Sequence, residues 1–384
     1  LTASGADAYL LHVTTTPSVS YVARADDFDC GIMISASHNP YHDNGIKLLN
    51  GEGEKMDDTV LDGIEAYLDS GEELPYATLD AIGRTVDYAA GRNRYIGYLI
   101  SLATRSYKGK KVGLDCANGS TWMMAKSVFD ALGADTFVIN NLPDGLNINV
   151  DCGSTHIGQL CEYVKNGGMA AGFAFDGDAD RCLAVDENGK VIDGDRIIAV
   201  LAKRMKEKKI LKGDAAVVTV MSNLGFHDFM KQNGMKTVCA KVGDRYVLEE
   251  MQRSGYNIGG EQSGHIIMLD HATTGDGQLT AAMLIKVMTE TGKSLAQLCE
   301  GIEDYPQLLV NVKITESGKG KWNKVPAIMD CISAAEKELG GSGRVLVRES
   351  GTEPLVRVMV EGKDMDMVKR LADSIAEEVK RSLT

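Results

Sequence analysis

Three aspartates, Asp176, Asp178 and Asp180, alternate with a glycine and an alanine between two apolar runs of the chain. Carboxylates at alternate positions of a compact loop direct several hard oxygen atoms toward one point, and Mg²⁺ prefers such ligands, often completed by substrate phosphate oxygens. Without a cation, the three negative charges would repel one another. The pattern therefore predicts a Mg²⁺ site, with a solvated acidic turn as the alternative.

The same loop fits a calcium-binding loop poorly. Glu187 stands at the twelfth position counted from Asp176, as such a loop requires, but Arg181 stands where the loop needs a glycine. The flanking residues also have the pattern of strands rather than helices. We therefore reject the calcium loop.

A polar turn after an apolar strand provides a candidate nucleophile. The strand expected over 31–34 leads into Ser-Ala-Ser-His-Asn-Pro at 35–40, with Ser37 at the tip of the turn. Pro40 lacks an amide donor and keeps the preceding residue out of the helical region. Ligands of α/β proteins usually lie beyond strand ends, which favours a reactive Ser37, although the same residue types form ordinary turns. Lys47 follows closely enough to bring a cation to this turn.

A glycine-rich loop at 259–265 suits a sugar ligand. Its glycines allow close approach of a ligand, Glu261 and Ser263 are suited to hydrogen-bonding sugar hydroxyls, and His265 is a candidate for proton transfer. A polar β-turn with a structural histidine is the alternative. A weaker loop begins at Lys241 and is either part of the site or a contact between domains.

The last part of the chain offers a phosphate cradle. Guanidinium groups pair with phosphate oxygens, and hydroxyls and glycine-freed amides add further donors. An ordinary turn with surface arginines is the alternative. The candidate residues are Arg348, Ser350, Gly351, Thr352 and Arg357.

Composition narrows the partners. The chain has 384 residues, enough for two to four domains, and its net charge of −13 argues against nucleic acid, which selects basic surfaces. Eight scattered cysteines without a CxxC pair indicate a reduced, cytoplasmic protein rather than a disulfide scaffold. No apolar run reaches membrane-spanning length, so we expect no membrane partner. We also expect the chain to be a monomer or a homodimer.

The elements that position these loops alternate between strands and helices, as in layered α/β proteins, until the rhythm changes near residue 308 to that of a small α+β domain. We expect four domains, at 1–90, 91–193, 194–305 and 306–384. The expected strands are 8–13, 31–34, 111–116, 136–140, 170–175, 182–185, 215–221, 256–258, 308–314, 344–347 and 355–360. The expected helices are 58–68, 93–102, 121–132, one opening at 195, 278–289, 325–339 and 365–383.

Taken together, four loops give the chain a resemblance to the α-D-phosphohexomutase superfamily, and within it to the bacterial glucosamine branch. Four such motifs in this order are highly specific, and the resemblance extends over essentially the whole chain. Gln262 favours the glucosamine branch, because the phosphomannomutase/phosphoglucomutase branch usually has methionine there. The motifs are SASHNP at 35–40, DGDADR at 176–181, GEQSGH at 260–265 and RESGTEP at 348–354.

The resemblance implies three related α/β domains, with mixed sheets and flanking helices, and a C-terminal α+β domain, arranged around a central cleft. It implies that Ser37 is carried as phosphoserine, with Ser35 as the alternative, and that a phosphoserine oxygen and the three aspartates hold one Mg²⁺. Lys47, Arg181 and His265 would then act in catalysis. Lys241, Glu261 and Ser263 would bind the sugar, and Arg348, Ser350, Gly351, Thr352 and Arg357 the phosphate that is not reacting.

The implied activity is the conversion of glucosamine 6-phosphate to glucosamine 1-phosphate through a bisphosphorylated sugar, which also serves as activator, feeding UDP-N-acetylglucosamine and cell-wall synthesis. The alternatives are phosphomannomutase/phosphoglucomutase activity and a catalytically impaired phosphosugar-binding fragment. Two departures from the family pattern stand out. Ala179 replaces a usual glycine, and an N-terminal stretch with FGTDGxRG and GRDTR-like loops is not in this sequence, so we expect an N-terminally truncated form.

Overall fold

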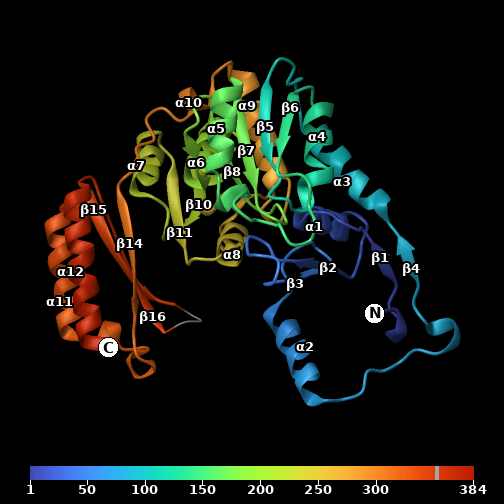
Figure 1. Ribbon diagram of the computed structural model, residues 1–384, viewed down its shortest axis with the longest axis horizontal. Helices are drawn as coiled ribbons and strands as arrows, with labels where there is room; N and C mark the ends of the chain where they lie inside the picture. The colour runs from blue at the N-terminus through green and yellow to red at the C-terminus, as the bar shows by residue number, and fades with distance from the viewer. Residues whose placement is uncertain (351–353) are drawn as a thin grey trace. The chain divides into compact units, whose positions relative to one another are not determined.

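The computed structural model describes residues 1–350 and 354–384, which form two compact units (Figure 1). One unit contains Leu1–Ser222 and Met230–Glu300, and the other contains Asn223–Phe229 and Gly301–Thr384. Mixed sheets with flanking helices give the α/β fold that the sequence predicts.

The N-terminal part of the first unit contains two small two-stranded sheets. One is parallel and the other is an antiparallel hairpin whose turn carries Ser37. Pro17 near the start of the first helix and the Thr15 side chain, which accepts from the Ser18 amide, explain why that helix begins there. The elements are β1 (Ala8–Leu10), β4 (Thr85–Asp87), β2 (Cys30–Ser35), β3 (Gly45–Asn50), α1 (Thr16–Ala25) and α2 (Asp58–Ser70).

A five-stranded sheet of order β6-β5-β7-β8-β9 forms the next layer. All of β7 is buried, and β7 and β8 are antiparallel, so the three aspartates lie in a hairpin turn at the end of a core strand. Helix α5 packs across the sheet through Leu160 and Val164. The elements are α3 (Ala89–Ser101), β5 (Lys111–Asp115), α4 (Ala125–Ala131), β6 (Asp135–Ile139), α5 (Gly158–Gly167), β7 (Ala171–Phe175), β8 (Cys182–Asp186) and β9 (Val191–Ile192).

A four-stranded sheet of order β11-β10-β12-β13 follows in the same unit. Aspartates begin two of its helices: Asp193 accepts from the Arg196 amide at the start of α6, and Asp276 accepts from the Leu279 amide at the start of α9. The elements are α6 (Gly194–Glu207), β10 (Ala215–Thr219), β11 (Lys236–Ala240), α8 (Asp244–Ser254), β12 (Ile258–Gly260), β13 (Ile266–Met268), α9 (Gly277–Thr291) and α10 (Leu295–Leu298).

The second unit has the α+β composition expected from its sequence. Three antiparallel strands in the order β14-β16-β15 carry two helices, and the apolar face of the last helix is buried in the core. The elements are β14 (Gln307–Lys313), α11 (Pro326–Leu339), β15 (Gly343–Glu349), β16 (Leu355–Gly362) and α12 (Met365–Leu383), and α7 (Leu224–Gln232) begins in this unit.

Short 3₁₀ helices lie in the connections of the described residues. One of them corrects a prediction, because the helix expected over 121–132 begins as a 3₁₀ turn and only then becomes α4. The strand expected over 8–13 is also shorter, and His12 has a φ of 58° soon after its end. The 3₁₀ helices are η1 (Thr2–Ser4), η2 (Leu79–Ala81), η3 (Ser120–Met123), η4 (Gly153–Thr155), η5 (Lys212–Asp214), η6 (Glu316–Gly318), η7 (Trp322–Lys324) and η8 (Gly340–Ser342).

Sequence patterns missed several elements, including α1, β3, α5 and α8, some of which carry or support residues of the site described below. Within residues 1–350 and 354–384, the structure contains no helix with the length and hydrophobicity needed to span a membrane.

Candidate active site

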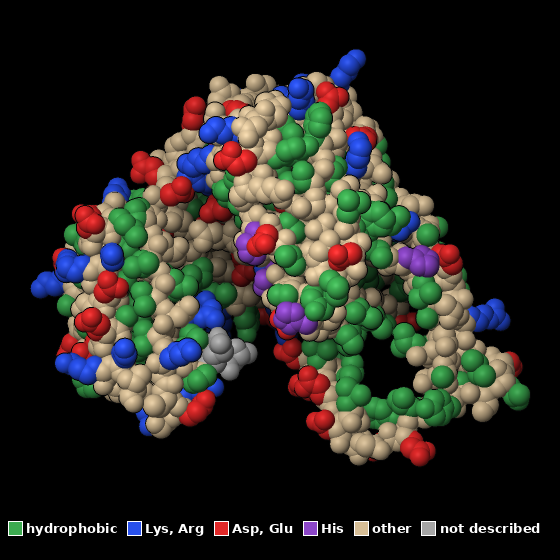
Figure 2. All heavy atoms as spheres, in the orientation of Figure 1, with side chains coloured by type: hydrophobic (Ala, Val, Ile, Leu, Met, Phe, Trp, Pro, Cys, Tyr) green, Lys and Arg blue, Asp and Glu red, His purple; other side chains and the backbone are tan. Residues whose placement is uncertain are grey.

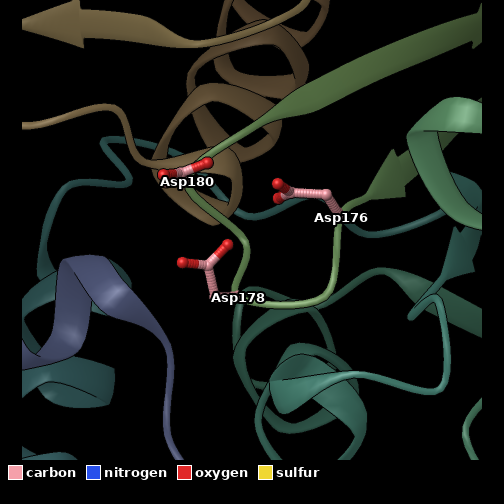
Figure 3. A group of neighbouring side chains, drawn as sticks. All are labelled: Asp176, Asp178 and Asp180. Carbon is pink, nitrogen blue, oxygen red and sulfur yellow. The ribbon is translucent and has the colours of Figure 1, made fainter. Parts of the chain in front are cut away.

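The three aspartates of the β7–β8 turn, here called the aspartate loop (176–180), converge on one space (Figure 3). All three side chains are buried, and one oxygen atom from each lies within 4.8 Å of the others. Each carboxylate also has a buried oxygen without a hydrogen-bond partner among the described residues: Asp176 Oδ2, Asp178 Oδ1 and Asp180 Oδ1. Buried oxygens without donors are rare in folded proteins, so the donor set fits a hard divalent cation such as Mg²⁺.

The electrostatics of the aspartate loop support the same conclusion. Burial raises the pKa of Asp176 well above its usual value, and the charges of Asp180 and Asp178 raise it further. Burial acts in the same direction on Asp180, but His265 and Lys47 outweigh it and hold the pKa of Asp180 well below its usual value. A bound cation would remove the penalty on Asp176, because it would neutralise the mutual repulsion of the carboxylates.

Ala179 takes the left-handed conformation in this loop, with φ of 59°. Its amide donates to Asp176 O at 3.1 Å, and its carbonyl accepts from Gly277 N at 2.9 Å. The alanine therefore adopts a backbone conformation that glycine adopts more readily, with its methyl group fully buried.

The turn that carries Ser37, here called the serine turn (35–40), rests directly on the aspartate loop. Ser37 is also left-handed, with φ of 52°. Its amide donates to Ser35 Oγ at 2.8 Å, and its carbonyl accepts from Gly177 N at 3.0 Å. Backbone contacts thus join residues that are far apart in the sequence, and they place the serine beside the three carboxylates.

Lys47, on β3, connects the serine with the carboxylates. Its Nζ lies 3.4 Å from Ser37 Oγ, 2.5 Å from Asp178 Oδ2 and 2.9 Å from Asp180 Oδ2. Burial acts to lower the pKa of Lys47, but the charges and hydrogen bonds of the two aspartates raise it above its usual value. The ammonium group is therefore held in its charged form next to the hydroxyl.

Thr16 completes the surroundings of Asp178, and sequence reasoning missed it. Its Oγ1 donates to Asp178 Oδ2 at 2.5 Å, and its amide donates to Asp178 O at 3.0 Å. The signal that was available is the run Thr14-Thr15-Thr16 before Pro17, which is typical of a helix N-terminus. That pattern locates the start of a helix but does not reveal a contact with a distant loop.

His265 is buried against the aspartate loop. Its Nδ1 lies 3.7 Å from Asp180 Oδ1, while its Nε2 accepts from Gly275 N at 3.0 Å and lies 3.6 Å from Asp244 Oδ2. Burial lowers the pKa of His265, and the neighbouring Asp180 and Asp244 raise it more, which favours a charged ring. The Gly275 amide requires a lone pair on Nε2, however, so in this arrangement the ring is neutral with Nδ1–H toward Asp180.

Arg181 follows the aspartate loop directly. Its amide donates to Asp176 Oδ1 at 3.2 Å, and its Nε is buried without a hydrogen-bond partner among the described residues. A guanidinium group in this position adds positive charge beside the carboxylates and has donor capacity left for an anion.

The glycine-rich loop is joined to the loop that begins at Lys241. Glu261 Oε1 accepts from Gly243 N at 3.0 Å, and Gln262 Nε2 donates to Asp193 Oδ2 at 3.2 Å. Ser263 and Lys241 are exposed. These two loops therefore form one polar surface, with Glu261 holding its parts together.

The phosphate-cradle candidates lie in the second unit. Arg348 on β15 stands opposite Arg357 on β16, and burial together with the charge of Arg357 lowers the pKa of Arg348. Two adjacent cations on one strand pair favour an anionic ligand. Ser350 is buried, and Gly351 and Thr352 lie outside the described residues.

Comparison with protein families gives the class of the chain. Four family models, each described as a phosphoglucomutase/phosphomannomutase domain, match in order: domain I over residues 1–75, domain II over 93–189, domain III over 193–305 and the C-terminal domain over 309–378. The chain belongs to the phosphoglucomutase/phosphomannomutase family.

Individual relatives are more specific. The phosphoglucosamine mutase of Lachnospira eligens is 55% identical over 99% of this chain and 84% of its own length. The phosphoglucosamine mutase of Caldicellulosiruptor bescii is 48% identical over 100% of this chain and 86% of its own length. These relatives cover all the loops described above.

Solved structures share the fold. A phosphoglucomutase/phosphomannomutase family protein from Burkholderia thailandensis has a TM-score of 0.79 at 22% identity, covering 100% of this chain and 84% of its own. An N-acetylphosphoglucosamine mutase of Aspergillus fumigatus, solved with GlcNAc-6P and magnesium, has a TM-score of 0.72 at 19% identity, covering 97% of this chain and 94% of its own.

Proposed function

We propose that this chain catalyses the interconversion of glucosamine 6-phosphate and glucosamine 1-phosphate, the reaction of the phosphoglucosamine mutases to which it is similar. The observation that carries the proposal is the bridge from Ser37 Oγ through Lys47 Nζ to Asp178 and Asp180. Phosphoryl transfer depends mainly on positioning and on electrostatic stabilisation, and this arrangement supplies both beside one hydroxyl.

In the proposed reaction, phosphorylated Ser37 gives its phosphoryl group to the free hydroxyl of the sugar phosphate. The bond between phosphorus and Ser37 Oγ breaks while a bond to the sugar oxygen forms, which gives a bisphosphorylated sugar. The bisphosphorylated sugar then reorients in the site, and its other phosphoryl group is transferred to Ser37. A bisphosphorylated hexosamine or hexose would prime the enzyme by phosphorylating Ser37.

Lys47 has a defined task in this sequence. Its ammonium lies 3.4 Å from Ser37 Oγ, so it can stabilise and protonate the oxygen as the phosphorus bond breaks. The proton that the sugar hydroxyl loses would then restore the charged lysine, and the reverse step would use the same groups in the opposite order. The contact with Oγ favours Lys47 over His265 for this role. His265 faces Asp180 and would chiefly hold that carboxylate in place.

Asp176, Asp178 and Asp180 would hold Mg²⁺ with a phosphoserine oxygen. When bound, the ion would neutralise charge on the transferring group. Arg181 would add a second positive charge on the same side. Glu261, Ser263 and Lys241 would bind the sugar, and Arg348, Ser350, Gly351, Thr352 and Arg357 the phosphate that is not reacting. All eight cysteines are free in the structure, which supports a reducing, cytoplasmic location.

The test is turnover of three substrates with Mg²⁺ and a bisphosphorylated hexose as activator. Glucosamine 6-phosphate should give the highest kcat/KM, above glucose 6-phosphate and mannose 6-phosphate. A preference for either of the other two would assign the chain to phosphoglucomutase/phosphomannomutase activity. Binding of all three without turnover would make it a phosphosugar-binding protein.

A further inference from the structure

Ser37 needs support from outside its own hairpin. The residue has φ of 52°, a left-handed conformation that residues other than glycine adopt only when their surroundings enforce it. The hairpin itself consists of β2 and β3, which pair with no other strand among the described residues. Two strands alone are marginally stable, so contacts from other elements must hold the serine turn.

Asn149 provides such contacts. It is buried, at 6% exposure, in the connection between β6 and the 3₁₀ helix η4. Its Nδ2 donates to Ser37 O at 2.8 Å and to Asn39 O at 2.8 Å. One side-chain amide therefore joins the Ser37 carbonyl to the Asn39 carbonyl within the serine turn.

The orientation of this amide is determined by its neighbours. Both backbone atoms at 2.8 Å are carbonyl oxygens, which only accept, so the atom facing them must be the NH₂ group. Asn149 is itself left-handed, with φ of 59°, and its amide donates to Ala117 O at 2.9 Å. The backbone of Asn149 is thus held by a contact that does not involve the serine turn.

Ser37 O receives a second hydrogen bond from Gly177 N of the aspartate loop. A carbonyl oxygen has two lone pairs, and here both are used, one by the side chain of Asn149 and one by the loop that carries the aspartates. The pair of contacts fixes the backbone of Ser37 relative to Asp176 and Asp178. The hydroxyl then has little freedom except rotation about its own side-chain bond.

We propose that Asn149 is a positioning residue for phosphoryl transfer, which holds the left-handed serine turn against the aspartate loop. The expected effect of Asn149 on kcat rests on the proposed function. The structural statement, that Asn149 clamps residues 35–40 through its hydrogen bonds, does not depend on the substrate. Among the described residues, the Asn149 side chain hydrogen-bonds to neither the Ser37 hydroxyl nor the carboxylates of the aspartate loop, so it acts through the Ser37 backbone.

Two variants of Asn149 separate the hydrogen bonds from packing. Asn149→Ala removes both donors, whereas Asn149→Asp keeps the shape and places a carboxylate oxygen against two carbonyl oxygens. We expect kcat to fall about tenfold to a hundredfold in the alanine variant, because small displacements of a reacting group cost rates of that order. The aspartate variant should lose more, and KM should stay within about threefold in both, because the sugar-binding loops are unchanged.

Asn147→Ala is the matched control. Asn147 lies in the same connection, but its side chain bonds only to Leu142 O and Asp144 N within that connection in the described structure. Its kcat should stay within about twofold of the unsubstituted chain, because a reacting group that is not displaced keeps its rate. Hydrogen exchange of the amides of residues 35–39 and Gly177 provides the second readout. Exchange there should accelerate in both Asn149 variants and not in the control.

The outcomes are distinguishable. Unchanged exchange in Asn149→Ala would overturn the clamp, and accelerated exchange with an unchanged kcat would overturn the positioning role. A larger loss in alanine than in aspartate would overturn the hydrogen-bond argument in favour of packing. If exchange accelerates in the Asn149 variants but the unsubstituted chain does not turn over glucosamine 6-phosphate, the clamp is upheld and the proposed function is refuted.

Discussion

The aspartate loop and the serine turn meet at one site but are carried by very different sheets. The aspartate loop ends a fully buried strand in a five-stranded sheet. The serine turn ends a two-stranded hairpin whose Ile34 and Ile46 are each 69% exposed, and Figure 2 shows apolar side chains at the surface of this N-terminal region. The more deeply buried part of the site is therefore the aspartate loop. Gly177 and Lys47 connect the serine turn to this loop, and Asn149 contacts the turn from the connection between β6 and η4.

The largest expected effect on activity comes from a substitution in the aspartate loop, the more deeply buried of the two regions. Asp178→Asn removes the charge that Lys47 and Thr16 share, and one ligand of the proposed Mg²⁺ site. We expect kcat to fall about a thousandfold, at the upper end of what loss of one electrostatic group costs in a preorganised site. Steady-state kinetics over a range of Mg²⁺ concentrations measures it, with Mg²⁺ affinity by calorimetry as a second readout.

Asp186→Asn is the matched control for that variant. Asp186 is a buried aspartate of the same sheet, but its Oδ1 accepts from Asn188 N and Lys190 N at the far end of β8. Asparagine retains that acceptor, so activity should persist. Full Mg²⁺-dependent activity in Asp178→Asn would contradict the assignment of the aspartate loop.

The sequence predicted the candidate reactive groups of this site better than the residues that hold them in position. Asp178, Ser37 and Lys47 were predicted because carboxylates, a turn hydroxyl and an amine are recognisable by type and spacing. Thr16 and Asn149 were missed, because a threonine at the start of a helix and an asparagine in a loop are common in any α/β chain. Their roles arise from contacts across 162 and 112 residues of sequence, which local patterns cannot report.

The same reason applies to the fold. Strongly patterned elements such as β7 and α12 were predicted closely, whereas β3 was missed because its residues 45–50 lack a clear alternation of polar and apolar side chains. The pairing of β2 with β3, which brings Lys47 opposite Met33 and toward Ser37, is fixed by tertiary structure.

A medium effect should come from a buried carboxyl behind the aspartate loop. Asp276 precedes Gly277, whose amide holds Ala179 O, and it accepts from Tyr95 OH at 2.9 Å. Burial raises the pKa of Asp276 to about 6 from a usual 3.8. The folded state therefore binds this proton more tightly than the unfolded state, so its contribution to stability is complete below pH 3.8 and lost as pH rises through about 6.

The expected size of that loss is about 3 kcal/mol between pH 4 and pH 7. Asp276→Asn cannot ionise and should remove this part of the pH dependence while keeping the acceptor for Leu279 N. Urea unfolding of both chains at several pH values measures the difference. Parallel pH profiles for the two chains would contradict the effect of burial on Asp276.

The smallest expected effect concerns Ala179. Replacing it with glycine removes the conformational cost of a left-handed alanine, roughly 1 kcal/mol. The same substitution removes the buried methyl group and raises the conformational entropy of the unfolded chain, and these two losses destabilise the folded state by a similar amount. We expect the free energy of unfolding to change by less than about 1 kcal/mol and kcat by less than about threefold. A tenfold change in kcat would show that the aspartate loop is less firmly held than its burial indicates.

The central claim is that Ser37, held against the aspartate loop, stores the phosphoryl group. Intact-mass spectrometry after incubation with a bisphosphorylated hexose and Mg²⁺ tests it directly, with Ser37→Ala and Ser35→Ala as paired variants. We expect the mass of one added phosphoryl group on the unsubstituted chain and on Ser35→Ala, located at Ser37 by peptide mapping, and none on Ser37→Ala. A phosphoryl group on Ser37→Ala, or mutase turnover in that variant close to that of the unsubstituted chain, would contradict it.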